Sequence, residues 1–288
     1  MNSQPPSSFS KLETSTKEFL ESNSLVAKVA FLILVLFAFI FLLKLGTYLI
    51  GYFLSPSGSP HLINGTIDAT NQMVIPQDPK MTNSITLLRS MNAQDGIEFT
   101  WSVWLNINSD TLQNGDTSYK HIFSKGNNNT TYCNGSDCLP GIYYPNNSPG
   151  MYLDGNKNEL LIIMNTYNEI NNTIYIPDIP LNKWVNVILI CQNTKLDVYI
   201  NGFVTASNML NGIPKQNYGD VYIGGNNLNA QISNLWYWNY ALNINEIQSI
   251  MNKGPNLKLL NEDTDTKNGT NYLSLRWYFY GLNDGYNP

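Results

Sequence analysis

A long apolar stretch near the amino terminus most restricts how this chain of 288 residues can fold. The run from Leu25 to Leu54 reads LVAKVAFLILVLFAFIFLLKLGTYLIGYFL and is interrupted only by Lys28 and Lys44. A helix needs about 20 apolar residues to cross a bilayer, and lysine stems can extend along it until their ammonium groups reach the headgroups. The run therefore predicts one transmembrane helix over residues 25–54, with the lipid bilayer as a partner.

A cleaved signal peptide is the alternative interpretation of this stretch. The apolar run is longer than the core of a signal peptide, begins late and lacks a small-x-small cleavage site, so we expect the helix to be retained. Lys11, Lys17 and Lys28 lie on its amino side, whereas no basic residue follows Lys44 before Lys80. The positive-inside rule then places the amino terminus in the cytosol and the carboxyl-terminal domain outside the cell, in a lumen or on a virion.

These patterns divide the chain into consecutive segments. A flexible SPSGSP spacer follows the apolar run, and a polar stretch over residues 10–21 before it is either a weak helix or disordered. The predicted segments are a cytosolic one at 1–24, the transmembrane helix at 25–54, a linker leading into the ectodomain at 55–80, and one large domain at 81–288.

Strand signals are dense throughout the large domain. Trp184–Cys191 is apolar on both faces, Leu196–Asn201 alternates apolar with polar residues, and Asn201-Gly202 is a strong hairpin signal. Short strands separated by Gly, Pro and Asn predict an all-β fold, a two-sheet antiparallel jelly-roll sandwich. The further strand candidates are 85–88, 97–107, 121–124, 150–153, 159–166, 173–176, 221–223, 232–239 and 272–280.

One helix is expected near the end of this series of strands. In ALNINEIQSIMNKGP, Asn243 can cap the helix and Glu246 completes a capping box, while Gly254-Pro255 ends it. The apolar residues of this segment share one face, so we expect the helix to pack against the sandwich.

The net charge restricts which partners the protein can bind, and the cysteines bear on whether the large domain faces an oxidising compartment. The net charge is −5 and no basic block occurs, which predicts no nucleic-acid partner. Cys133 and Cys138 bracket the short loop CNGSDC, whereas Cys191 ends an apolar strand. We expect a Cys133–Cys138 disulfide if this region faces an oxidising compartment; the alternative is two reduced thiols at the surface.

An ordered series of segments resembles a known family. The series consists of GIEFTWSVWLNI, HIFSKG, GMYLDGNKNELLIIMNT, IPLNKWVNVILICQNTKLDVYINGFVTAS, GDVYIGG and ISNLWYWNYALNINEI. Over about residues 85–251 it resembles the laminin-G-like branch of the concanavalin A-like lectin/glucanase superfamily. The resemblance implies a jelly roll that binds glycans or proteins, with calcium in many relatives. The anchor and the asparagine-rich composition also resemble membrane proteins of large DNA viruses.

Catalytic residues are not predicted. Retaining glycoside hydrolysis needs two carboxyl groups about 5 Å apart. The resemblance to glucanases would imply a Glu-x-Asp-x-x-Glu run on one strand, and the sequence has none. Its strand regions hold only isolated carboxylates, Glu98, Asp154, Glu159 and Asp197.

Ligand-binding candidates are easier to find. Tyr143, Tyr144 and Tyr152 with Asp154 and Asn156 place aromatic faces beside an amide and a carboxylate, a combination that suits sugar stacking and hydroxyl recognition. The alternative is that they are ordinary loop and edge residues. Asp154 with loop carbonyls is a candidate calcium site. Five tryptophans within strand patterns are expected to pack in the core: Trp101, Trp104, Trp184, Trp236 and Trp238.

These observations predict a membrane-anchored, non-catalytic recognition or structural module that binds glycans or proteins at a membrane surface, which could be viral. One alternative is a purely architectural tether between a virion membrane and its capsid. Another is a glycoside hydrolase with an unconventional carboxylate pair.

N-glycosylation sequons are compatible with an exposed domain but are frequent by chance in so asparagine-rich a chain; they begin at Asn64, Asn134, Asn171 and Asn268.

Overall fold

The structure is a computed structural model that describes residues 25–54, 56–93, 96–130 and 138–260. The chain divides into two compact units, one containing helix α2 (Leu25–Leu54) and one containing a β-sandwich. The predicted helix at 10–21, the predicted strand at 272–280 and Cys133 lie outside the described residues.

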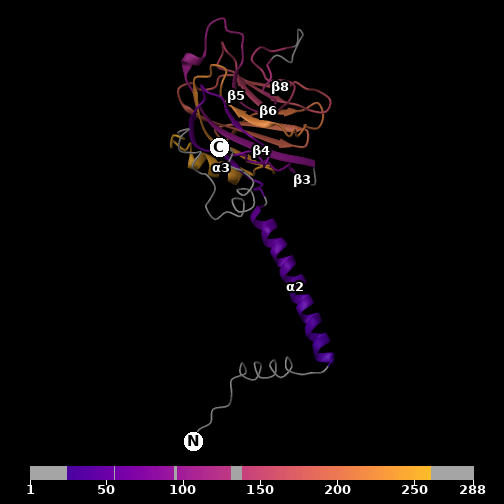
Figure 1. The fold of residues 1–288 in the computed structure, drawn as a ribbon. Helices are drawn as coiled ribbons and strands as arrows, with labels where there is room; N and C mark the ends of the chain where they lie inside the picture. The colour runs from indigo at the N-terminus through magenta and orange to yellow at the C-terminus, as the bar shows by residue number, and fades with distance from the viewer. Residues whose placement is uncertain (1–24, 55, 94–95, 131–137, 261–288) are drawn as a thin grey trace. The chain divides into compact units, whose positions relative to one another are not determined.

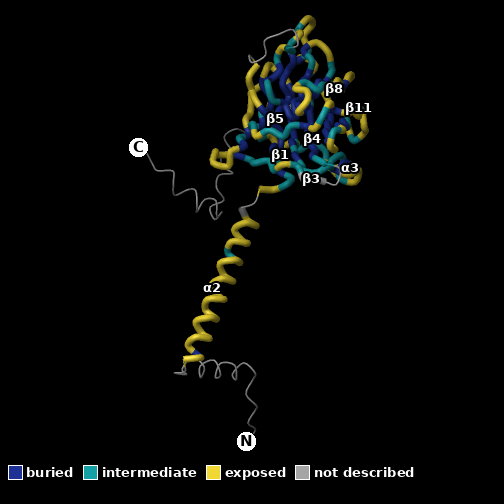
Figure 2. Tube along the Cα trace, turned by 90° about the vertical axis from the view of Figure 1, so that its right-hand side faces the viewer, coloured by how far each residue is buried: buried dark blue, intermediate teal, exposed yellow. Residues whose placement is uncertain are grey.

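Helix α2 has the bounds that the apolar run predicts. An 18-residue window within Leu25–Phe53 has a mean hydropathy of 3.0, and this stretch is long and apolar enough to cross a membrane. At 1.5 Å per residue, its 30 residues extend over about 45 Å. Its large apolar side chains are exposed along most of the helix (Figure 2). Such a helix suits a membrane anchor or a signal sequence.

The second unit is a sandwich of two antiparallel sheets (Figure 1), as the strand patterns predict. Sheet A has the order β1-β13-β4-β9-β10-β11, with β3 paired to β4, and sheet B has the order β2-β12-β5-β6-β7-β8. The strands of sheet A are β1 (His61–Asp68), β3 (Met91–Ala93), β4 (Gly96–Ile107), β9 (Trp184–Gln192), β10 (Lys195–Ile200), β11 (Phe203–Met209) and β13 (Ala230–Trp238). Those of sheet B are β2 (Met73–Ile75), β5 (Lys120–Gly126), β6 (Asn147–Leu153), β7 (Leu160–Met164), β8 (Asn172–Ile176) and β12 (Asp220–Ile223).

The core lies between the sheets, where alternate residues of each strand point inward. Trp101 of β4 is almost fully buried, with its ring centroid 5.4 Å from that of Phe123 in sheet B and 5.0 Å from that of Tyr237 in β13. These aromatic contacts join the two sheets. Figure 2 shows the buried residues gathered inside the sandwich and the exposed residues on its loops.

Strands β9, β10 and β11 form a meander, and its second turn is the Asn201-Gly202 hairpin that the sequence predicts. Asn201 and Gly202 have φ of 50° and 82°, and Ile200 pairs with Phe203 across the turn. Positive φ at both central residues is what a tight two-residue hairpin requires, and Asn-Gly adopts it at low cost. This prediction is therefore confirmed.

The outer faces of both sheets are partly covered. On sheet B, side chains that alternate with the core residues pack beneath the segment that precedes β6. This packing explains why β6 and β7 are buried on both faces. The outer cluster consists of Tyr119, Ile142, Tyr144, Tyr152, Leu161 and Ile163. On sheet A, helix α3 (Ile244–Lys253) packs Ile247 against Ile188 and Ile190 of β9. The predicted capping box of Asn243 and Glu246 is present at the start of α3.

Two features of the strand assignment differ from the sequence prediction. Strands β1 and β2 lie within residues 55–80, the predicted linker segment, so that segment supplies a strand to each sheet. Residues 85–88 form no strand; this prediction is wrong, because the segment is held by the side chain of Gln77, which accepts a hydrogen bond from the Leu87 N–H and donates one to the Ile85 carbonyl.

Candidate ligand-binding pocket

A cavity of about 320 Å³ lies where the start of β4 and the end of β13 face the end of β5 and the start of β6. We call it the inter-sheet pocket. Two loops complete its wall, one between β2 and β3 and one between β11 and β12. The lining residues are Gln77, Asp78, Thr86, Leu87, Leu88, Arg89, Phe99, Trp101, Lys125, Ser148, Gln216, Asn217, Tyr218 and Tyr237.

Aromatic side chains form one wall of this pocket. Phe99 and Trp101 come from β4 and Tyr237 from β13, and all three are core residues whose remaining accessible atoms border the cavity. The hydroxyl of Tyr237 donates a hydrogen bond of 2.9 Å to the Leu88 carbonyl, which holds the β2–β3 loop over the cavity. The aromatic wall is thus fixed by the sandwich core.

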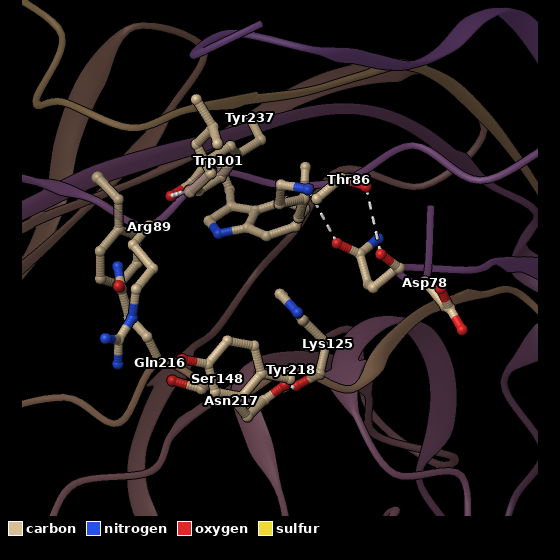
Figure 3. Close-up of a pocket in the computed structure, with 14 residues that line it drawn as sticks. Asp78, Thr86, Arg89, Trp101, Lys125, Ser148, Gln216, Asn217, Tyr218 and Tyr237 are labelled. Atoms are coloured by element: carbon tan, nitrogen blue, oxygen red, sulfur yellow. Dashed lines mark hydrogen bonds between the residues drawn. The ribbon is translucent and has the colours of Figure 1, made fainter. Parts of the chain in front are cut away.

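Polar groups form the opposite wall (Figure 3). Lys125 is only 9% exposed, and its Nζ donates a hydrogen bond of 2.7 Å to the Gly219 carbonyl. Burial lowers the pKa of the Lys125 ammonium to about 8, while the nearby Asp220 carboxylate acts in the opposite direction. Asn217 donates from its side chain to the Lys125 carbonyl at 2.9 Å, which joins the loop to β5.

The mouth of the pocket carries an exposed aromatic ring and a second cation. Tyr218 is 79% exposed, and the guanidinium carbon of Arg89 lies 5.6 Å from the centroid of its ring. Asp78 is the one carboxylate among the described residues that line the pocket. Its Oδ1 accepts a hydrogen bond of 2.9 Å from the Lys80 backbone N–H. The pocket therefore combines an aromatic wall, amides and more positive than negative charge.

The three tyrosines predicted as a sugar platform lie in the interior. Tyr152 is fully buried; its hydroxyl donates to Asn147 Oδ1 at 2.6 Å and accepts from the Tyr143 N–H at 3.2 Å. The hydroxyl of Tyr143 accepts from Gln72, and that of Tyr144 from the Leu139 N–H. With Tyr143 6% and Tyr144 4% exposed, no ring face is open to a sugar, so the geometry does not support the stacking interpretation.

Asp154 and Asn156 form a local turn rather than a site with these tyrosines. Asp154 Oδ1 accepts hydrogen bonds from the backbone N–H groups of Asn156 at 2.8 Å and Lys157 at 2.9 Å. Within the part of the chain that the structure describes, no group of three or more His, Cys, Asp or Glu side chains is placed to hold a metal ion. Asp154 therefore belongs to no such group within the described residues, and the calcium site stays a prediction.

The isolated carboxylates do not line the inter-sheet pocket. Glu98, Asp154, Glu159 and Asp197 are all outside its lining. Asp197 instead pairs with Lys195, with 2.7 Å between Nζ and Oδ2.

The cysteines differ in state. Cys138 is disulfide-bonded, and Cys191 is a free, buried thiol whose pKa is raised to about 12 by burial. The predicted partner of Cys138, Cys133, lies outside the described residues, so the specific pairing stays a prediction.

Four of the five tryptophans separate into two groups, contrary to the expectation that all five pack in the core, and the fifth, Trp184, is half-buried at the start of β9. Trp101 points inward, whereas Trp104, Trp236 and Trp238 line a cavity of about 200 Å³ on the other face of sheet A, beside α3. His61 stacks on Trp236 with centroids 3.8 Å apart, and Trp236 stacks on Trp238 at 5.5 Å. The spacing of Trp101 and Trp104 indicates that both cannot point into the core, because residues three apart on a strand face opposite sides of the sheet.

Sequence reasoning missed the residues of the inter-sheet pocket. Lys125, Arg89 and Gln216–Tyr218 come from one strand and two loops that are far apart in the chain. No local pattern marks them, since each alone looks like an ordinary polar residue.

The fold defines the class of this protein as a two-sheet jelly-roll sandwich. A laminin-G family model, described as "Concanavalin A-like lectin/glucanases superfamily", matches residues 80–248. The chain belongs to this superfamily. The comparison with curated proteins found no match.

Several solved structures are similar to part of this chain. The receptor binding domain of botulinum neurotoxin D has 12% identity and a TM-score of 0.44, covering 65% of this chain and 43% of that one. The binding domain of botulinum neurotoxin serotype G has 12% identity and a TM-score of 0.43, covering 67% and 50%. A Trypanosoma rangeli sialidase, solved with a difluoro-KDN compound, has 17% identity and a TM-score of 0.38, covering 54% and 22%. This chain thus spans half or less of each of these structures.

Proposed function

We propose that this protein is a membrane-anchored, non-catalytic recognition module whose sandwich binds a glycan or protein at a membrane surface. The observation that carries the proposal is the inter-sheet pocket, with aromatic side chains on one wall and amide, hydroxyl and cationic groups on the other. A concave site with an apolar lining and a few convergent polar groups is the usual form of a ligand site. The anchor would hold many copies on one surface, where weak contacts add through effective concentration.

Several features support this anchoring and orientation. Helix α2 has the length and hydropathy of a membrane span, and the lysines lie mainly on its amino side. The disulfide at Cys138 suits an oxidising compartment such as the lumen or the cell exterior. We therefore infer a cytosolic amino terminus and an external or lumenal sandwich. The likeness to viral membrane proteins stays a prediction, and the proposal holds for a host or a virion membrane.

The make-up of the pocket favours binding over hydrolysis. Most glycoside hydrolases use a pair of carboxyl groups on either side of the scissile bond, and Asp78 is the one carboxylate among the described lining residues. The architectural tether is the second candidate. The outer face of sheet B favours it, because a cluster of buried side chains fills part of that face.

A binding screen separates these functions. The full-length protein, reconstituted in nanodiscs of neutral phosphatidylcholine, is applied to arrays of glycans and of membrane-surface proteins with and without calcium. We expect saturable binding that Tyr218→Ala weakens about tenfold or more, because Tyr218 lies exposed at the pocket mouth. Tyr167→Ala is the matched control, as Tyr167 is exposed but does not line the pocket.

Two results would count against the proposal. Absence of binding in both arrays would favour the tether. Turnover of a bound glycan into a shorter product would favour the hydrolase.

A further inference from the structure

The charges in the inter-sheet pocket do not balance. Lys125 and Arg89 are the cations that line it, against the single carboxylate of Asp78. Across residues 25–54, 56–93, 96–130 and 138–260, the ion pairs within 4.0 Å are Lys120–Asp116 and Lys195–Asp197, so neither pocket cation belongs to one. A ligand that carries negative charge would supply the missing partner.

Lys125 is the pocket cation for which an anionic partner would matter most. It is nine-tenths buried, and its ammonium has three donors, of which one is directed to the Gly219 carbonyl at 2.7 Å. A buried ammonium costs free energy unless it is paired and hydrogen-bonded. The lowered pKa of Lys125 has burial as its largest cause, and the carboxylate of Asp220 only partly opposes it.

The surrounding loop holds Lys125 in place for a ligand. Asn217 donates a hydrogen bond to the Lys125 carbonyl at 2.9 Å and accepts one from the Gly219 N–H at 3.0 Å. Both ends of the lysine, its backbone and its ammonium, are thereby tied to the β11–β12 loop. An anion that reaches this ammonium would meet a site that needs little rearrangement.

The remaining groups suit a sugar ring better than a peptide. The cavity of about 320 Å³ lies at the lower end of the range for small-molecule pockets, roughly 300–1,000 Å³, which suits a small ligand such as a sugar ring. Ser148 Oγ donates to the sulfur of Met164 at 3.3 Å, which leaves its lone pairs for a ligand hydroxyl. Tyr218 presents an open aromatic face at the mouth, on which a sugar can stack.

We propose that the inter-sheet pocket binds an acidic saccharide, a sugar ring whose carboxylate or sulfate contacts Lys125 and Arg89. This inference rests on the proposed function and names the ligand class of the same site. The ammonium of Lys125 binds the anion inside the cavity, and the guanidinium of Arg89 contacts it at the mouth. The aromatic wall excludes water around the contact, which strengthens it relative to one in bulk solvent.

Matched ligands test the charge requirement. The full-length protein in neutral phosphatidylcholine nanodiscs is titrated calorimetrically with oligogalacturonate, with its fully methyl-esterified form, with dextran sulfate, with dextran and with oligoglutamate. We expect oligogalacturonate, dextran sulfate or both to bind at least tenfold more tightly than the uncharged counterpart. Equal affinity for the charged and uncharged members of both pairs overturns the acidic-saccharide inference but leaves the recognition function standing. Tighter binding of oligoglutamate than of either acidic saccharide overturns the saccharide assignment.

Variants test the named residues. Lys125→Met keeps the stem and removes the charge, and we expect it to weaken binding of the preferred acidic saccharide about 30-fold. Arg89→Gln, at an exposed position where folding is not at risk, is expected to weaken it about fivefold. Lys157→Met removes an exposed lysine outside the pocket and serves as the control. If Arg89→Gln and a folded Lys125→Met both bind as the wild type does, the inference is wrong. If no ligand in this set or in the array screen binds, the proposed function itself fails.

Discussion

At the scale of single residues, His121 shows how burial controls protonation. It is completely buried in β5, with Nδ1 2.8 Å from the Gly224 carbonyl and Nε2 2.9 Å from Ser124 Oγ. Because a carbonyl only accepts, Nδ1 carries the proton and neutral Nε2 accepts from the serine hydroxyl. Desolvation lowers the pKa of His121 from 6.5 to about 4.

This pKa predicts a stability change in mild acid. Between pH 6.5 and 4 the unfolded chain binds a proton at His121 and the folded chain does not, so the free energy of unfolding falls as pH falls. The contribution is complete above pH 6.5 and is lost through about pH 4, amounting to about 3 kcal/mol. Denaturant titrations at several pH values are expected to show a flatter pH dependence for His121→Asn. The other histidine, His61, titrates in both proteins, and identical slopes would contradict the assignment.

The buried tyrosines give a second prediction at this scale. Tyr152→Phe removes a hydroxyl that serves Asn147 Oδ1 and the Tyr143 N–H, leaving buried polar groups without partners. We expect the free energy of unfolding to fall by about 1–3 kcal/mol. Tyr167→Phe, at an exposed position, is the control and is expected to change stability little. Unchanged stability of Tyr152→Phe in urea unfolding would contradict this prediction.

At the scale of elements, helix α3 depends on its first turn. Asn243 accepts hydrogen bonds from the N–H groups of Asn245 at 2.9 Å and Glu246 at 3.1 Å. Asn243→Ala is expected to lower the free energy of unfolding by about 1 kcal/mol, measured by chemical denaturation. Asn245→Ala, two residues further on and exposed, should be neutral or slightly stabilising because alanine favours helices. A neutral effect of the Asn243 substitution would argue that packing of Ile247 alone holds the helix.

Local patterns predict some elements and miss others for a physical reason. The β9-β10-β11 meander and α3 follow from hairpin and capping signals that lie within a few residues of each other. Strand β1 was not predicted from the sequence, because it forms by pairing with the distant strand β13, where His61 lies opposite Trp236. The inter-sheet pocket could not be predicted from the sequence for the same reason, since Arg89, Lys125 and Gln216 come together only when the two sheets stack.

At the scale of the whole molecule, topology is the property to test. Expressed in eukaryotic cells, the full chain is expected to remain in the membrane fraction after alkaline carbonate extraction, because α2 has the length and hydropathy of a span. Protease added to intact lumen-enclosing vesicles should remove an amino-terminal tag and spare the sandwich domain. Release of the domain by carbonate would indicate a cleaved signal sequence, and digestion of the domain with protection of the tag would reverse the orientation.

The two ends of the described sandwich lie next to each other. Thr66 of β1 donates its backbone N–H to the Lys258 carbonyl at 2.7 Å and accepts from the Leu260 N–H at 2.9 Å. Residues about 190 positions apart are thus joined along one margin of sheet A. A polypeptide that enters and leaves at one place can be transplanted as a cassette: spliced into a surface loop of an unrelated host, this sandwich would need only short connecting stretches and would leave the host's own fold undivided.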